Sequence, residues 1–149
     1  MNVEVIIKII WMCFLFIFTF QDIKYREIDI VGIIIFYIFI IGVYLYRLYI
    51  GQDLNLLHII LGILSGILLF SLSKFNIMGE GDAFVFIGSG ALLGIKNNIL
   101  LLFITVFIIS FYALIMGVYC LIRGRKLKNI EVAMLPFITM ANCIIWLLL

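Results

Sequence analysis

The stretch MGEGDAFVF, Met78–Phe86, sets Glu80 and Asp82 among glycines, with long apolar stretches on both sides. The apolar residues that follow, Ala83–Ile95, number 13. At about 1.5 Å of rise per residue, a helix of this length is too short to cross roughly 30 Å of hydrocarbon. It spans a membrane only if Phe75–Asp82 contributes, which places Asp82 at or just below the membrane surface. An ionised carboxylate at that depth is costly, so a chain that keeps one there usually uses it.

The composition of the whole chain supports a membrane environment. Of 149 residues, 67% are hydrophobic and only 12% are charged, whereas soluble domains are about half apolar and about a quarter charged. The chain is therefore expected to be an integral membrane protein whose partner is the lipid bilayer. Its net charge of +2 is too small to indicate a nucleic acid partner. The length allows one domain, residues 1–149, and no separate soluble module.

The apolar stretches predict an all-α membrane protein, a polytopic bundle of six transmembrane helices. A spanning helix needs about 20 residues. Besides the fourth span described above, the expected spans are Val3–Phe20, Ile30–Tyr46, Leu56–Leu72, Ile99–Ile122 and Val132–Leu149. In the first span, Glu4 and Lys8 have the i,i+4 spacing of an ion pair. This span lacks the cleavage site of a signal peptide, so we expect it to be retained.

The basic residues predict the orientation of the bundle. With six spans, one side of the membrane carries seven of them, Lys24, Arg26, Lys74, Arg123, Arg125, Lys126 and Lys128. The other side carries three, Lys8, Arg47 and Lys96. Because loops rich in lysine and arginine stay in the cytoplasm, the odd-numbered loops are expected inside and both termini outside.

The cysteines and the single histidine do not form a metal-binding pattern. Cys13, Cys120 and Cys143 lie inside apolar stretches and have no C-x-x-C spacing, which favours small core residues over a disulfide or zinc set. His58 lies near the outer start of the third span, where we interpret it as an interfacial or helix-packing residue. The sequence therefore predicts no metal and no cofactor.

Two glycine pairs predict close contact between helices. Gly62 and Gly66 in the third span and Gly90 and Gly94 in the fourth have G-x-x-x-G spacing. Small residues at this spacing let helix backbones approach closely. We expect packing inside the bundle rather than dimerisation.

Asp22 is the candidate partner of Asp82, because it directly follows FLFIFTFQ at the inner end of the first span. Two carboxylates that lie close together cannot both ionise cheaply, so they share a proton. One, ionised, takes a proton from water; the other, protonated, polarises an amide carbonyl and later protonates the leaving nitrogen. Gly79 and Gly81 carry no Cβ and would let a substrate backbone approach closely. The alternative is that both glycines merely break a helix and both aspartates are interfacial residues.

Three segments resemble a known family. MGEGDAFVFIGSGALLG, residues 78–94, is similar to the G-x-G-D region of type IV prepilin peptidases, membrane aspartic proteases that include archaeal preflagellin peptidases. QDIKYREIDI, residues 21–30, resembles the first aspartate segment of the family, and RGRKLKNIEVAMLPFI, residues 123–138, resembles the basic loop before the last helix. The resemblance implies a single membrane-embedded peptidase domain over residues 1–149. Within it, Asp22 and Asp82 would be catalytic, and Gly79 and Gly81 would be the motif glycines.

The chain departs from the family pattern in ways that bear on substrate positioning more than on the aspartate pair. Phe84 stands where the family often has a lysine, Asp29 replaces a proline, and Ala133 and Met134 replace the earlier half of a P-F-x-P-F motif. Longer members carry a cysteine-rich cytoplasmic insertion with a zinc site, linked to N-methylation of the product. This chain resembles a short form without that insertion, and its residues do not determine whether it also methylates.

The resemblance implies precursors of type IV pilins or related proteins as substrates. Such precursors carry a class III signal peptide, a short basic leader that ends in glycine before an apolar helix. The leader would stay in the cytoplasm, so the active site is expected on the cytoplasmic side of the cell membrane. The acids Glu27, Asp29, Glu80 and Glu131 would attract the basic leader; the simpler interpretation is that they are solvated surface charges.

Two other functions remain open from the residues alone. The chain would be a small ion or proton carrier if Asp22 and Asp82 formed a polar transport site, or a non-catalytic membrane subunit if they were incidental. A carrier is expected to hold its acids near the middle of the bilayer and often has an internal repeat. The sequence determines neither which pilin, pseudopilin or flagellin would be cleaved nor the oligomeric state.

Overall fold

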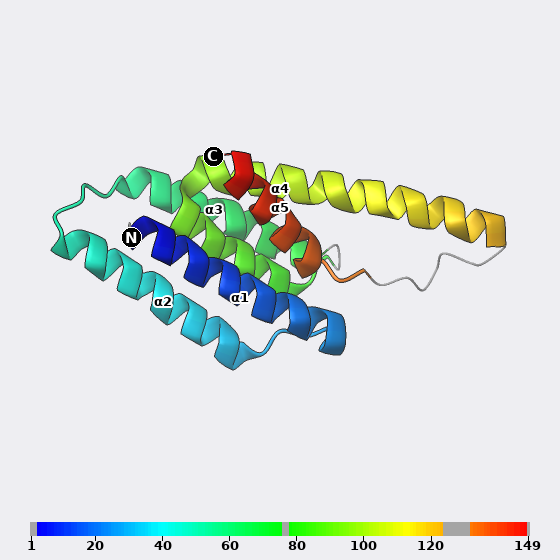
Figure 1. Ribbon diagram of the computed structural model, residues 1–149, viewed down its shortest axis with the longest axis horizontal. Helices are drawn as coiled ribbons and strands as arrows, with labels where there is room; N and C mark the ends of the chain where they lie inside the picture. The colour runs from blue at the N-terminus through cyan, green and yellow to red at the C-terminus, as the bar shows by residue number, and fades with distance from the viewer. Residues whose placement is uncertain (1–2, 76–77, 124–131, 149) are drawn as a thin grey trace.

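The computed structural model describes residues 3–75, 78–123 and 132–148, and the regular secondary structure in these residues is all helical. The elements, drawn in Figure 1, are α1 (Val3–Tyr25), α2 (Ile30–Tyr49), α3 (Leu56–Ser73), α4 (Glu80–Arg123) and α5 (Leu135–Leu148). The all-α class is therefore confirmed for the described part of the chain.

The expected count of six spanning helices is wrong. Of the five helices in the described residues, α1, α2 and α4 are long and apolar enough to cross a membrane, and α3 and α5 are shorter apolar helices. The spans expected at Ala83–Ile95 and Ile99–Ile122 belong to one element, α4, of 44 residues. The count is wrong because α3 and α5 fall short of the length of a span and because the two expected spans are segments of one element, with Lys96 in the helical part after Gly94 rather than in a loop.

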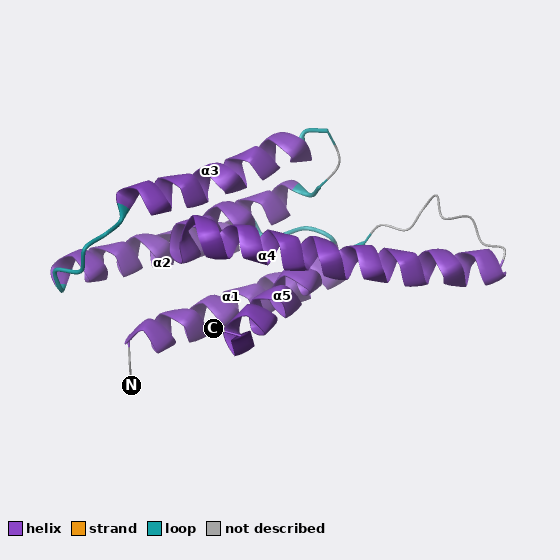
Figure 2. Cartoon of the chain, turned by 90° about the horizontal axis from the view of Figure 1, so that it is seen from above, coloured by secondary structure: helices purple, strands orange, loops and turns teal. Residues whose placement is uncertain are grey.

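The helix α4 nevertheless folds back on itself at Gly94. The backbone there is non-helical, with φ 73° and ψ 175°, and a positive φ of this size favours glycine. The side-chain Nδ2 of Asn98 donates to the carbonyl of Phe86 at 3.3 Å. These residues would be about 18 Å apart in a straight helix. Residues 80–93 and 95–123 are therefore two halves that lie against each other near the break (Figure 1), while the end of the second half projects beyond the other helices (Figures 1 and 2).

The contact between α3 and α4 depends on glycines. A Cβ on Gly62 would collide with the backbone of Gly90, and a Cβ on Gly66 would lie 2.5 Å from the Cα of Ile87. A Cβ on Gly94 would collide with the ring of His58. The predictions that these glycines serve internal packing and that His58 is a packing residue are therefore confirmed.

A buried polar cluster joins α3 to both halves of α4. Asn98 is 2% exposed; its Oδ1 accepts a hydrogen bond from the Ser89 hydroxyl at 2.6 Å, and its Nδ2 donates to the Ser65 hydroxyl at 2.8 Å. A buried amide must be hydrogen-bonded to be tolerated. The cluster thus stabilises the fold-back at Gly94 with polar bonds inside an apolar bundle.

Aromatic and aliphatic side chains fill the space between α1, α2, α4 and α5. Trp11 of α1 stacks on Phe36 of α2, with ring centroids 4.9 Å apart, and Leu15 and Phe18 are fully buried. Large apolar side chains also cover the outward faces of the helices, for example Phe107, which is 74% exposed. Such a surface suits contact with lipid rather than with water.

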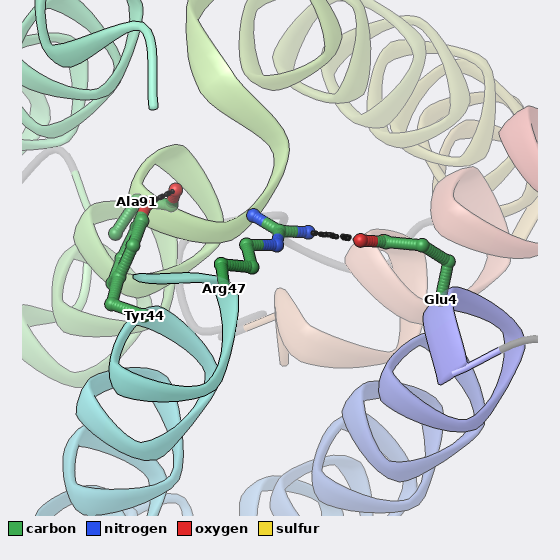
Figure 3. A network of polar contacts seen from close by, with 4 residues as sticks. All are labelled: Glu4, Tyr44, Arg47 and Ala91. Atoms are coloured by element: carbon green, nitrogen blue, oxygen red, sulfur yellow. Dashed lines mark hydrogen bonds and ion pairs between the residues drawn. The ribbon is translucent and has the colours of Figure 1, made fainter. Parts of the chain in front are cut away.

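Polar contacts also tie α1, α2 and α4 together at the end of the bundle where α1 begins (Figure 3). Arg47 of α2 makes an ion pair with Glu4 of α1, with 3.0 Å between Nη2 and Oε2. The hydroxyl of Tyr44 donates to the carbonyl of Ala91 in α4. The expected pair between Glu4 and Lys8 is therefore wrong, because Glu4 reaches across to the neighbouring helix instead.

Candidate active site

Asp82 lies in the first turn of α4, and its carboxylate turns back toward the start of the helix. The Ala83 N–H donates to the carbonyl of Gly79 at 3.3 Å, so Gly79 immediately precedes the helix. A Cβ on Gly79 would lie only 2.9 Å from Asp82 Oδ2. The absence of a side chain at Gly79 therefore leaves the space that the Asp82 carboxylate occupies. Asp82 is only 9% exposed.

Asp22 lies near the end of α1 and contacts the start of α5. Its Oδ2 accepts a hydrogen bond from the backbone N–H of Leu135, the first residue of α5, at 3.1 Å. The carbonyl of Met134 accepts from the N–H groups of Phe137 and Ile138 at 3.0 and 3.2 Å, so Met134 caps the helix. Asp22 thus satisfies an amide that has no acceptor inside α5.

The fold brings Asp22 and Asp82 to one cavity of about 390 Å³. The charge of Asp22 acts on Asp82 across this space. In Figure 1 the end of α1 and the starts of α4 and α5 lie at the same end of the bundle, which explains why the two aspartates share a cavity. The other lining residues are Arg26, Glu27, Ile28, Ile30, Ile33, Gly79, Glu80, Gly81 and Phe84.

Gly81 also accommodates a group of the protein itself. A Cβ at this position would lie 2.6 Å from Cδ1 of Ile28, in the connection between α1 and α2. The absence of a side chain lets that connection pack against the first turn of α4. Gly79 makes room for Asp82 and Gly81 for Ile28. Both glycines also line the cavity, so the expected role of letting a substrate backbone approach stays a prediction.

The four acids expected to attract a basic leader have different positions. Glu27 and Glu80 are exposed and line the cavity. Asp29 is not among the lining residues; it is the N-cap of α2, where its carboxylate accepts from the Val31 N–H at 3.1 Å. Glu131 lies outside the described residues. The structure thus gives Asp29 a local role, since aspartate is a preferred N-cap residue.

One side of the cavity is apolar. Phe84 lines it, and its ring packs on Phe70 of α3, with centroids 5.2 Å apart. The hydroxyl of Tyr37 donates to the Phe84 carbonyl at 3.0 Å. Ile30 and Ile33 at the start of α2 are further apolar residues of the lining. The cavity therefore combines carboxylates with an apolar wall.

The described residues contain no group of three or more His, Cys, Asp and Glu side chains placed to hold a metal ion. The three cysteines are free, and they differ in burial. Cys120 is buried, as expected, but Cys13 is exposed on α1. The interpretation of Cys13 as a core residue is therefore wrong, because this face of α1 points away from the bundle.

The cavity lies within the part of the chain that matches a known protein family. The model of the type IV leader peptidase family matches residues 9–114. The matched stretch includes both aspartates and every residue that lines the cavity. Searches of curated proteins and of solved structures gave no match.

Proposed function

The chain belongs to the type IV leader peptidase family, and we propose that it is a membrane aspartic endopeptidase that removes the basic leader from prepilin-like precursors. One observation carries the proposal: Asp22 and Asp82, from different helices, line the same cavity and interact electrostatically. Acids that merely marked the ends of two spans would have no reason to share a cavity. Family membership alone supports leader peptidase activity; the paired aspartates support the aspartic mechanism.

The paired carboxylates supply an acid and a base for hydrolysis of one peptide bond. The ionised carboxylate takes a proton from water, and the resulting hydroxide adds to the scissile carbonyl carbon. The protonated carboxyl stabilises the developing oxyanion by hydrogen bonding and then gives its proton to the leaving nitrogen as the C–N bond breaks. The products are an acid and an amine, and the pair still holds one proton.

The lining of the cavity suits a precursor that has a basic leader next to an apolar segment. Among the described residues that line it, Glu27 and Glu80 accompany the two aspartates, and Arg26 is the cationic one. This excess of negative charge favours lysines and arginines of a leader. Ile30, which is 71% exposed, continues the apolar wall onto the open face of α2. The apolar segment of the substrate would lie along this face, within the bilayer.

We place the cavity at the cytoplasmic boundary of the cell membrane. The support is the charge asymmetry of the sequence, seven basic residues against three. The count still applies because the break at Gly94 reverses the chain where the loop after the fourth span was expected. Asp22 lies at the end of α1 and Asp82 at the start of α4, so both are at helix ends. A carrier would be expected to hold such acids near the middle of the bilayer.

The test is cleavage by the purified protein in lipid vesicles. The substrate is a peptide with a lysine-rich leader, a glycine and an apolar segment, and mass spectrometry identifies the products. A cut after the glycine is expected. Proton flux through the vesicle membrane without any cut would overturn the proposal in favour of a carrier.

A further inference from the structure

The hydrogen bond between Asp22 and α5 bears on how the two aspartates divide the chemistry. The Leu135 N–H donates to Asp22 Oδ2 at 3.1 Å. Leu135 is fully buried, so a water molecule would not take the place of its N–H as a donor to Asp22. The contact joins residues 113 apart in sequence, and Leu135 lies beyond the stretch matched by the family model.

Asp22 and Asp82 have different surroundings. Asp22 is partly buried, which favours its neutral form. Unlike Asp82, however, it meets the N-terminal end of α5, where the helix dipole and free amides favour a negative charge, and the Arg26 charge acts in the same sense. Asp82 is 9% exposed, and the Asp22 charge faces it. Burial and a neighbouring negative charge both favour a neutral carboxyl over a carboxylate. The surroundings therefore favour charge on Asp22 and the shared proton on Asp82.

We infer that the first turn of α5 is a positioning element of the active site, whose Leu135 amide holds Asp22 as the ionised base while Asp82 acts as the acid. This inference rests on the proposed function and deepens it. An ionised carboxylate has about four acceptor positions, so the Leu135 amide leaves room for the water that Asp22 activates. Leu135 touches no reacting atom in this scheme; it acts through Asp22.

The other charged groups near Asp22 are the same in every variant of Leu135 that the experiment below compares. Arg26 and Glu27, from the connection after α1, and Glu80 and Asp82, from α4, line the same cavity. The described residues of α5 carry no charged side chain. All of these groups stay unchanged when only the backbone donor at position 135 is removed.

The experiment compares Leu135→Pro with Leu135→Ala. Both lose the buried leucine side chain, but only the proline variant lacks the N–H. Proline is well tolerated at the first helical position, and the residue before it, Met134, has the capping position that favours extended backbone. A third variant, with an ester in place of the Leu135 amide, removes the same N–H and keeps the leucine side chain, in case the proline variant fails to fold.

We expect kcat of Leu135→Pro and of the ester variant to be at least tenfold below that of Leu135→Ala, with KM nearly unchanged. The pH at which activity falls by half on the acid side should rise by about one unit, because the ionised base has lost a donor that favoured its charge; one unit corresponds to about 1.4 kcal/mol. Identical acid limbs in the proline, ester and alanine variants would overturn the inference and leave the peptidase proposal intact.

A readout without substrate separates the two proposals. In an Asp82→Asn background, infrared spectroscopy follows the carbonyl band of protonated Asp22, assigned by its loss in Asp22→Asn. With Leu135→Pro or the ester this band should appear at higher pH than with Leu135→Ala. If the wild-type protein cleaves no peptide, the proposed function fails, and this titration still decides whether the α5 amide holds Asp22 in its charged form.

Discussion

Glu4 and Asp22 are carboxylates on the same helix, α1, but their electrostatic surroundings are opposite. At the start of α1, Glu4 faces Arg47 at 3.0 Å, and the two charges compensate each other. Near the other end of α1, Asp22 faces a second acid, Asp82, across a cavity, and the backbone N–H of Leu135 donates a hydrogen bond to it. The first arrangement serves stability. The second costs stability, and such a cost is typical of functional sites.

If this contrast is right, the largest effects on activity come from the end of the bundle that holds the aspartates. Asp22→Asn and Asp82→Asn should each lower cleavage by about a thousandfold or more, because asparagine can neither hold the charge nor deliver a carboxyl proton. The double variant should be little worse than either single one, since the pair works as a unit. Cleavage rates of the three proteins in lipid vesicles provide the measurement.

The thermal stability of the same variants gives the control. Asparagine removes an acid that is costly to keep beside another acid in a partly buried site, so neither single variant should unfold at a lower temperature than the wild type. Full activity in Asp22→Asn would break the comparison, because Asp22 would then be only an acid at the end of a span. In that case Asp82 would need another partner.

The next effect concerns packing away from the aspartates. Gly62→Ala should lower the free energy of unfolding by about 1–3 kcal/mol, since its Cβ collides with the backbone of Gly90 and forces α3 away from α4. Gly42→Ala is the matched control, because apart from its chain neighbours and the backbone of its own helix no atom lies within 4 Å of a Cβ at that position. It should be neutral or stabilising by up to about 1 kcal/mol, as alanine favours helix. Unfolding in mixed micelles measures both. Equal effects of the two changes would mean that the α3–α4 contact is looser than described.

Some parts of the structure can be predicted from the sequence, and others cannot. The apolar stretches predicted helices, and the acids at their ends predicted Asp22 and Asp82 as candidates, because helix periodicity and burial are local properties. The sequence predicts a reversal of the chain between Ala83–Ile95 and Ile99–Ile122, but not its position at Gly94. Lys96 and Asn98 suggested a loop, whereas Asn98 is buried against residues of α3 and of the first half of α4. A polar residue is tolerated there only because partners distant in sequence satisfy its hydrogen bonds.

The contact of Asp22 with Leu135 was missed for the same reason. The sequence favoured a partner for Asp22 among the other acids, and no local pattern points to a backbone amide 113 residues away. The start of α5 at Leu135, just before Pro136, was the available signal, because proline near a helix start marks amides that need acceptors. The role of Asp29 could have been found by the same reasoning, since it directly precedes α2.

A smaller effect is expected from the exposed acids at the cavity. Glu27→Gln and Glu80→Gln should each raise KM for a lysine-rich leader by severalfold at low salt, and the difference should shrink as salt screens the charges. Asp29→Asn provides the control. It removes the same charge but keeps an N-cap residue for α2, and Asp29 does not line the cavity. If Asp29→Asn raised KM as much as Glu80→Gln, the leader would sense the overall charge of the surface rather than the acids at the cavity.

We expect the smallest effect from changes to the ion pair between Glu4 and Arg47 at the start of α1. Glu4 is half exposed, although the side chain of Arg47 is only 17% exposed. A pair with one solvated partner contributes little, so a double-mutant cycle with Glu4→Gln and Arg47→Gln should give a coupling of at most about 1 kcal/mol, reduced further by salt. Arg47→Gln alone should cost more than Glu4→Gln, because the arginine stem is packed while the carboxylate is not. Neither change should alter kcat, since the pair lies at the opposite end of α1 from Asp22. A loss of kcat in Glu4→Gln comparable to that in Asp22→Asn would show that the two ends of the bundle are coupled, and the division between a stabilising end and a reactive end would not hold.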